Sequence, residues 1–124
     1  MEVKFKMGSE ASILNSVKKL CNVAESDTSF DTDLIMFTNA QLSVLPQLGV
    51  CDTPFSIDGD SEEWSDFLEE GSDETEMVKA YIGVSVRLVF DPPSSGSVKE
   101  ALQSYKDELE WRINVAVDPG KEED

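Results

Sequence analysis

MVKAYIGVSVRLVF, residues 77–90, is the most apolar run of its length in the chain. Apolar residues recur at helical spacing on one face (Met77, Tyr81, Val84 and Leu88) and on a second flank (Ile82, Val86 and Val89). A helix that is apolar on most sides is buried on most sides. The β-branched residues also permit a strand, but the run is longer than a typical strand of roughly five or six residues. We therefore predict a central buried helix.

The end of this helix is set by Asp91-Pro92-Pro93. Proline disfavours helical dihedrals in the residue before it and lacks the backbone donor that a helix interior needs. On the other side, Ser72 or Asp73 is placed to cap the helix, and Glu74 and Glu76 fall in its first turn, where acids suit the helix dipole.

Composition bounds the rest of the chain. Its 124 residues carry 10 Lys and Arg against 26 Asp and Glu, a formal net charge of −16. We predict a single domain over residues 1–124, with an N-terminal arm at 1–8, a helical bundle at 9–115 and a polar C-terminal tail at 116–124. An acidic surface repels nucleic acid and anionic membranes, but an acidic wall also allows DNA to pass without sticking.

The chain lacks histidine. This removes the usual general base near neutral pH and the commonest metal ligand, so we predict no enzymatic activity, no cofactor and no metal. Cys21 and Cys51 are widely spaced and predict a buried reduced pair rather than a disulfide scaffold. We expect neither a signal peptide nor a membrane span.

Helical patterns precede and follow the central run. Ser9 or Ser12 is placed to cap a first helix with apolar residues from Ile13 to Cys21. Asp31 or Thr32 is placed to cap a second one, in which Pro46 predicts a kink or a tight end and Gly49 a stop. We predict an all-α fold, a small antiparallel bundle of about four main helices plus one short helix.

A last helix is predicted from Ser97, which forms a capping-box pattern with Glu100, to about Ile113. Its expected buried row contains Val98, Ala101, Leu102, Tyr105 and Leu109.

Between the second helix and the central one lies an acid-rich segment, residues 52–76, with eleven acids and no Lys or Arg. A short helix at 62–68 is expected here, pinned by Trp64. Acids at 58, 60, 62 and 69 partly fit a calcium loop, but the sixth position, which needs glycine, is Glu63. A solvated acidic loop is therefore the favoured interpretation.

The two tryptophans have different expected roles. Trp64 is predicted to close the edge of the core. For Trp111 the pattern leaves two roles equally open, an edge of the core or an interface anchor, since tryptophan is enriched in the residues that dominate binding energy.

Five short motifs carry a family resemblance, and none of them holds catalytic residues. They are Phe30-Asp31-Thr32-Asp33, Gln47-Leu48-Gly49-Val50, Trp64-Ser65-Asp66-Phe67-Leu68, Val89-Phe90-Asp91-Pro92-Pro93 and Glu108-Leu109-Glu110-Trp111-Arg112. Over about residues 12–115, the chain resembles the head–tail connector (adaptor or head-completion) proteins of tailed bacteriophages.

The resemblance implies a structural homo-oligomeric ring, commonly of twelve subunits, that docks on the phage portal protein in the virion neck. Such a ring extends the channel for double-stranded DNA, which it contacts without sequence specificity, and receives the next neck or tail protein. It would be made in the bacterial host cytoplasm and would not bind membrane. The expected portal contacts are Trp111, Arg112, Ile113, Val115 and Val117. The acids expected to face the channel or a neighbouring subunit are Asp58, Asp60, Glu62, Glu63, Glu69 and Glu70.

Two rival hypotheses rest on the acids alone. An acidic DNA-mimic inhibitor would occupy the basic cleft of a nucleic-acid enzyme and would stay monomeric or dimeric. A calcium-dependent enzyme or sensor would change its melting temperature when calcium is added.

Overall fold

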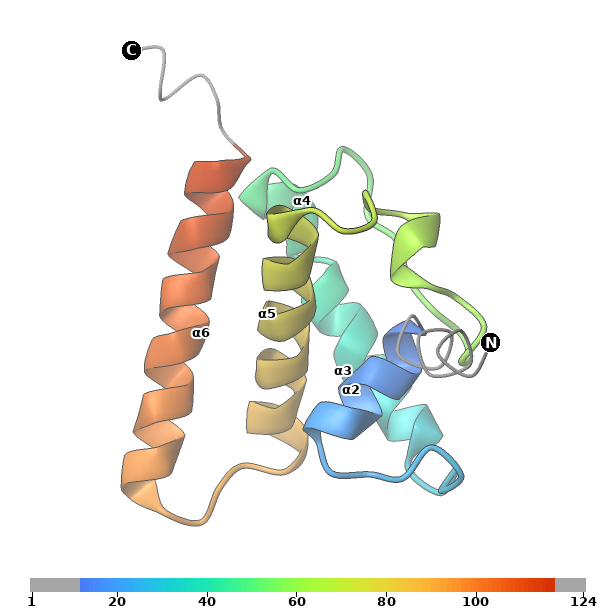
Figure 1. Ribbon diagram of the computed structural model, residues 1–124. Helices are drawn as coiled ribbons and strands as arrows, with labels where there is room; N and C mark the ends of the chain where they lie inside the picture. The colour runs from blue at the N-terminus through green and yellow to red at the C-terminus, as the bar shows by residue number, and fades with distance from the viewer. Residues whose placement is uncertain (1–11, 118–124) are drawn as a thin grey trace.

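The computed structural model describes residues 12–117, and regular structure in this range is helical (Figure 1). The predicted all-α bundle is confirmed. The predicted arm at 1–8 and most of the predicted tail lie outside the described residues. The helices are α2 (Ile13–Leu20), α3 (Asp31–Leu42), α4 (Leu45–Leu48), α5 (Asp73–Phe90) and α6 (Gly96–Ala116), with a 3₁₀ turn at Trp64–Asp66.

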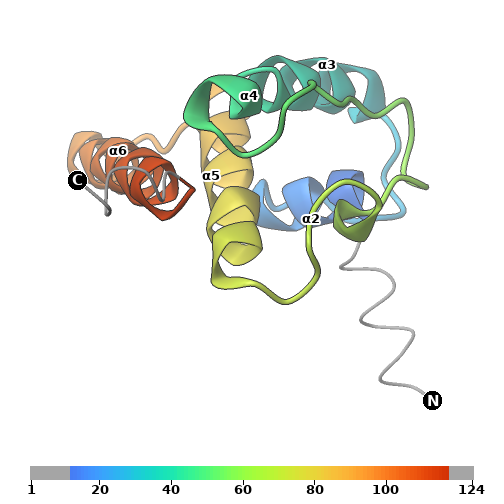
Figure 2. The same ribbon diagram turned by 90° about the horizontal axis from the view of Figure 1, so that it is seen from above.

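The central helix is α5, and it lies between α6 on one side and α2 and α3 on the other (Figure 2). The predicted helix is confirmed, and it begins at Asp73, directly after Ser72, one of the two predicted caps. Ser72 caps it, because the Ser72 hydroxyl accepts a hydrogen bond from the Thr75 backbone N–H at 3.0 Å. From Tyr81 to Val86 every residue is buried.

The core fills the space between α2, α3 and α5. Gly83 allows the close approach of α2, because a Cβ atom at this position would lie 1.9 Å from Leu20 Cδ1. The fully buried side chains of this core include Ile13, Leu14, Val17, Leu34, Leu42, Leu45, Val78, Ile82 and Val86.

A buried lysine ties α2 to the start of α3. Lys18 is 2% exposed, and its ammonium group lies 2.7 Å from an Asp31 carboxylate oxygen. The same group donates hydrogen bonds to the Glu25 and Asp27 carbonyl oxygens, at 3.2 and 3.0 Å. An ammonium group has three protons, so this set of oxygens satisfies it and holds the α2–α3 connection in one conformation.

The ends of α3 and α4 correct one prediction and confirm another. The N-cap of α3 is Phe30, which makes no side-chain cap, so the predicted caps at Asp31 and Thr32 are wrong. The expected disturbance at Pro46 is present, because α3 ends at Leu42 and Pro46 lies at the start of the separate helix α4. Gly49 terminates α4 with φ = 89°, a conformation that glycine adopts without strain.

The start and the faces of α6 differ from prediction. The N-cap is Ser95, whose hydroxyl accepts a hydrogen bond from the Val98 N–H at 3.4 Å, so the predicted capping box of Ser97 and Glu100 is wrong. Of the expected buried row, Leu109 is buried, whereas Val98 and Tyr105 are 48% and 45% exposed. The helical spacing of the apolar residues predicted the apolar face of α6 correctly. In the first half of the helix, however, no other described element covers this face.

Candidate assembly surface

Helix α6 is attached to the bundle mainly through α5. Leu109 and Ile113 are its buried residues. The Tyr81 hydroxyl of α5 donates a hydrogen bond to the Glu110 carboxylate at 2.8 Å. Burial, and next the hydrogen bond to Glu110, raise the pKa of Tyr81 well above its ordinary value. The C-terminal end of α6 also contacts α4, where the Asn114 side chain donates to the Leu48 carbonyl oxygen at 3.4 Å.

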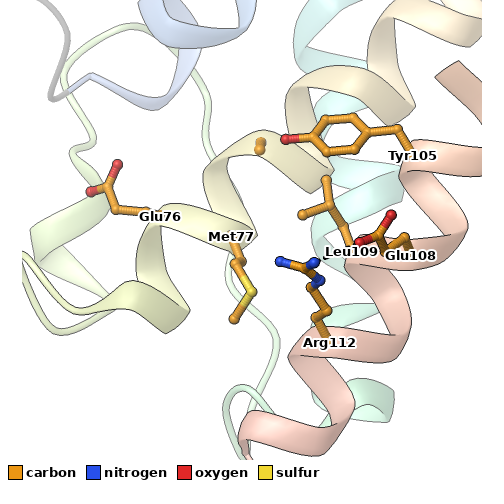
Figure 3. A pocket seen from close by; sticks show the side chains of 7 residues that line it. Glu76, Met77, Tyr105, Glu108, Leu109 and Arg112 are labelled. Atoms are coloured by element: carbon orange, nitrogen blue, oxygen red, sulfur yellow. Dashed lines mark ion pairs between the residues drawn. The ribbon is translucent and has the colours of Figure 1, made fainter.

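A groove of about 260 Å³ runs along one side of the α5–α6 contact. Its apolar lining comes from both helices: Met77, Ala80, Tyr105 and Leu109. Figure 3 shows Leu109 and Arg112 reaching from α6 toward Met77 on α5. Small-molecule sites usually have volumes of roughly 300–1,000 Å³, so this groove suits a single large side chain better than a cofactor.

Ion pairs border the groove on both helices. On α6, Arg112 lies 2.7 Å from the Glu108 carboxylate, an i,i+4 pair in the favoured order. On α5, Lys79 lies 3.1 Å from the Glu76 carboxylate. Of the two acids that line the groove, Glu108 is paired with a cation that also lines it, Arg112, whereas Lys79 lines a separate hollow.

Trp111 projects from another side of α6. At about 100° per residue, Trp111 is about 160° around the helix from Leu109, which faces α5. Its side chain is 67% exposed, the largest exposed fraction among the large hydrophobic side chains of the described residues. A second hollow of about 260 Å³ lies beside it, and it is lined by Leu48, Asp107, Glu110, Trp111 and Asn114.

The acid-rich segment is anchored to the helices rather than free. The Asn39 side chain forms two hydrogen bonds with the backbone of Ile57, at 2.9 and 2.8 Å. The Trp64 indole N–H donates to the Ser16 hydroxyl at 3.0 Å, and Trp64 is 2% exposed. Trp64 therefore closes the core, as predicted. The rings of Phe55 and Phe67 stack with centroids 4.2 Å apart.

Two of the six acids named from the sequence have local structural roles. The Glu62 carboxylate accepts a hydrogen bond from the Asp58 N–H at 2.8 Å, and Glu63 forms a capping box with Asp66. Glu62 raises the pKa of the Asp58 carboxyl group in two ways, first through a side-chain hydrogen bond and then through the negative charge of the Glu62 carboxylate. The other acids, Asp58, Asp60, Glu69 and Glu70, are exposed.

The described residues contain no cluster of three or more acids, cysteines or histidines that would hold a metal ion. Cys21 and Cys51 are both free thiols. Burial raises the pKa of the Cys21 thiol to about 11, so it stays protonated and a poor nucleophile near neutral pH. None of the helices between residues 12 and 117 is long and apolar enough to cross a membrane.

The five residues expected to contact a portal have unequal exposure. Trp111 and Arg112 are exposed, and Val115 and Val117 are partly buried. Ile113 has no exposed surface. Within this fold Ile113 therefore belongs to the core. Val117 also packs close to Gly49, because a Cβ atom on that glycine would lie 2.8 Å from Val117 Cγ2.

The groove between α5 and α6 was not predicted. Met77, Tyr105 and Leu109 are expected from the sequence to lie in the core, since their helical spacing indicates an apolar face but not what covers it. The Arg112–Glu108 pair lies beside the groove, but an exposed ion pair by itself does not indicate a binding surface.

Comparison with known proteins gives the chain a family. No significant match was found among curated proteins or among solved structures. The model of a family described as phage connector protein matches residues 13–120, which is most of the chain. The matched range begins at the first residue of α2 and includes α3, α5 and α6. The chain therefore belongs to the phage connector protein family.

Proposed function

We propose that this protein is a structural subunit of a tailed-phage neck. In this proposal, copies of the chain assemble into a ring that docks on the portal, extends the DNA channel and joins the head to the tail. The family match over residues 13–120 carries the proposal. The exposed face of α6 supports the proposal, because apolar surface that the rest of a protein leaves uncovered marks a site of protein–protein contact.

The net charge of −16 suits a wall along which DNA moves. Like charges repel over roughly a Debye length, about 8–10 Å at physiological ionic strength. The exposed acids Asp58, Asp60, Glu69 and Glu70 are the proposed channel-facing or neighbour-facing groups, together with Glu62 and Glu63. The last two also hold the loop in shape, so their removal would change its geometry as well as its charge.

The portal contact is proposed at the C-terminal end of α6. Arg112, Val115 and Val117 lie there with part of their surface exposed, and residues 118–124 continue the chain from this point. Trp111 belongs to the same region, but its position on another side of α6 points to a neighbouring copy of the chain as its partner. The number of subunits is expected to be twelve.

Native mass measurement of the full chain, alone and mixed with the portal protein of the same phage, tests the proposal. A ring-sized species in either sample, together with detection of the chain in purified virion necks, is the expected result. A chain that stays monomeric in both samples and instead binds a basic nucleic-acid enzyme in a salt-sensitive manner would contradict it and support the DNA-mimic alternative.

A further inference from the structure

We infer that neighbouring copies of this chain contact one another head to tail, with Trp111 of one copy inserted into the α5–α6 groove of the next. This inference rests on the proposed ring and names the surfaces that form it. The two surfaces are the Trp111 face of α6 (Asp107, Glu110, Trp111 and Asn114) and the groove (Met77, Ala80, Tyr105 and Leu109).

Trp111 is a large aromatic side chain that the described residues leave mostly exposed. Its large aromatic surface is 67% exposed on a side of α6 that faces away from α5. Burying such a side chain in a desolvated pocket is the commonest source of binding energy at protein interfaces. Among the residues from 12 to 117, the hollow beside it supplies one apolar side chain, Leu48, and, Trp111 itself aside, its other lining residues are polar.

The groove has complementary size and chemistry. Its volume of about 260 Å³ is below that of typical small-molecule sites but admits an aromatic side chain. Met77 gives it a flexible, polarisable wall, which packs well against aromatic rings. Arg112 lies at its edge, and a guanidinium group over an indole face adds a cation–π attraction.

Charge favours this pairing of surfaces over others. Two copies that each carry −16 repel one another across most of their surfaces. Arg112 is the cation that lines the groove, and it is paired with Glu108. Asp107 and Glu110 accompany Trp111 on its own face and would approach Arg112 of the neighbouring copy. Contact is therefore less repulsive at the groove than at the acid-rich segment 52–76, which carries no Lys or Arg.

The placement of the two surfaces decides the symmetry. They share no lining residue and occupy different sides of α6. Contact between two different surfaces is heterologous, and repeated heterologous contacts close into a ring or extend into a filament. In a two-fold dimer, both surfaces of one copy would have to meet the same partner at once, and their positions on different sides of α6 disfavour this.

Disulfide trapping tests the contact directly. Trp111→Cys and Ala80→Cys are made separately in full-length chains that carry Cys21→Ala and Cys51→Ala, with helical content checked by circular dichroism. The two variants are mixed and oxidised, alone and with the portal protein. We expect an intermolecular disulfide between positions 111 and 80 in the assembled fraction. A disulfide between two 111 positions, or an assembled fraction without the 111–80 disulfide, would overturn the inference.

A second measurement uses chains in which both native cysteines are kept. Trp111→Ala is expected to raise the concentration required for assembly about tenfold or more, in keeping with loss of a dominant interface residue. Met36→Ala is the matched control, because Met36 is 59% exposed on α3, and it should leave assembly unchanged. Equal assembly of the Trp111→Ala variant and the unmodified chain would refute the contact while leaving the ring in place, whereas a chain that never assembles would refute the proposed function itself.

Discussion

The two sides of α5 are built differently. On one side, the eight-residue helix α2 buries Ile13, Leu14, Val17 and Lys18. On the other side, the 21-residue helix α6 buries only Leu109 and Ile113. Stability therefore depends mainly on the α2–α3–α5 side. Helix α6 packs along α5 but buries few of its own side chains, so most of its surface is available to other molecules.

Substitution in the α2–α3–α5 core should have the largest effect. Ile82 is fully buried, and Ile82→Ala is expected to lower the free energy of unfolding by about 2–5 kcal/mol, because the core closes only partly around the cavity. Urea unfolding followed by circular dichroism measures this. Leu109→Ala, beside the open groove, should cost less than Ile82→Ala. The reverse order would show that α6 is part of the main core.

Lys18→Met should have the next largest effect, about 3 kcal/mol. The change leaves the Asp31 carboxylate and two loop carbonyl groups without their ammonium partner, and breaking a buried ion pair is costly. Lys79→Met is the matched control on an exposed pair and should cost about 1 kcal/mol or less. If the two changes had equal effects in the same unfolding assay, Lys18 would not hold the α2–α3 connection.

Tyr81→Phe tests the link between the two sides. It removes a hydrogen bond to the Glu110 carboxylate and is expected to cost about 1–2 kcal/mol. The raised pKa of Tyr81 adds a pH dependence. Above pH 10, the ordinary pKa of tyrosine, the unfolded chain releases this proton while the folded chain keeps it, so stability falls as pH rises.

Unfolding of the unmodified chain and of the Tyr81→Phe variant between pH 9 and pH 11.5 measures this dependence. The decline above pH 10 should be steeper in the unmodified chain. Parallel curves would show that the pKa of Tyr81 is not raised in the folded chain.

The sequence predicted the features whose signals are local. The run at 77–90, a cap at Ser72 or Asp73 and the stop before Pro92 identified α5. Pro46 indicated the break after α3, and Gly49 the residue that ends α4. The role of Trp64 was also predicted, since a lone tryptophan in a short amphipathic piece has few other places to pack.

Features that depend on distant parts of the chain were missed. Lys18 reads in sequence as a cation that favours the end of a helix, and its burial depends on oxygens contributed by residues 25–31. Tyr105 and Val98 read as core residues because periodicity identifies an apolar face without saying whether another helix covers it. The α5–α6 groove follows from that missing cover.

The smallest expected effect on stability concerns two serines at the start of α6. Ser95→Ala removes the observed N-cap and should cost about 1 kcal/mol. Ser97→Ala removes only an exposed hydroxyl, which lies 3.1 Å from that of Ser95, and should cost much less.

Amide hydrogen exchange is the appropriate measurement, because local opening of a helix end changes exchange there before it changes global unfolding. Exchange should accelerate in the first turns of α6 after Ser95→Ala, while amides of α5 keep their protection. Acceleration throughout α5 would show that the two sides of the molecule open together. A larger effect from Ser97→Ala would indicate that Ser97 is the N-cap and forms the capping box with Glu100. In that case α6 would begin at the position that the sequence pattern predicts.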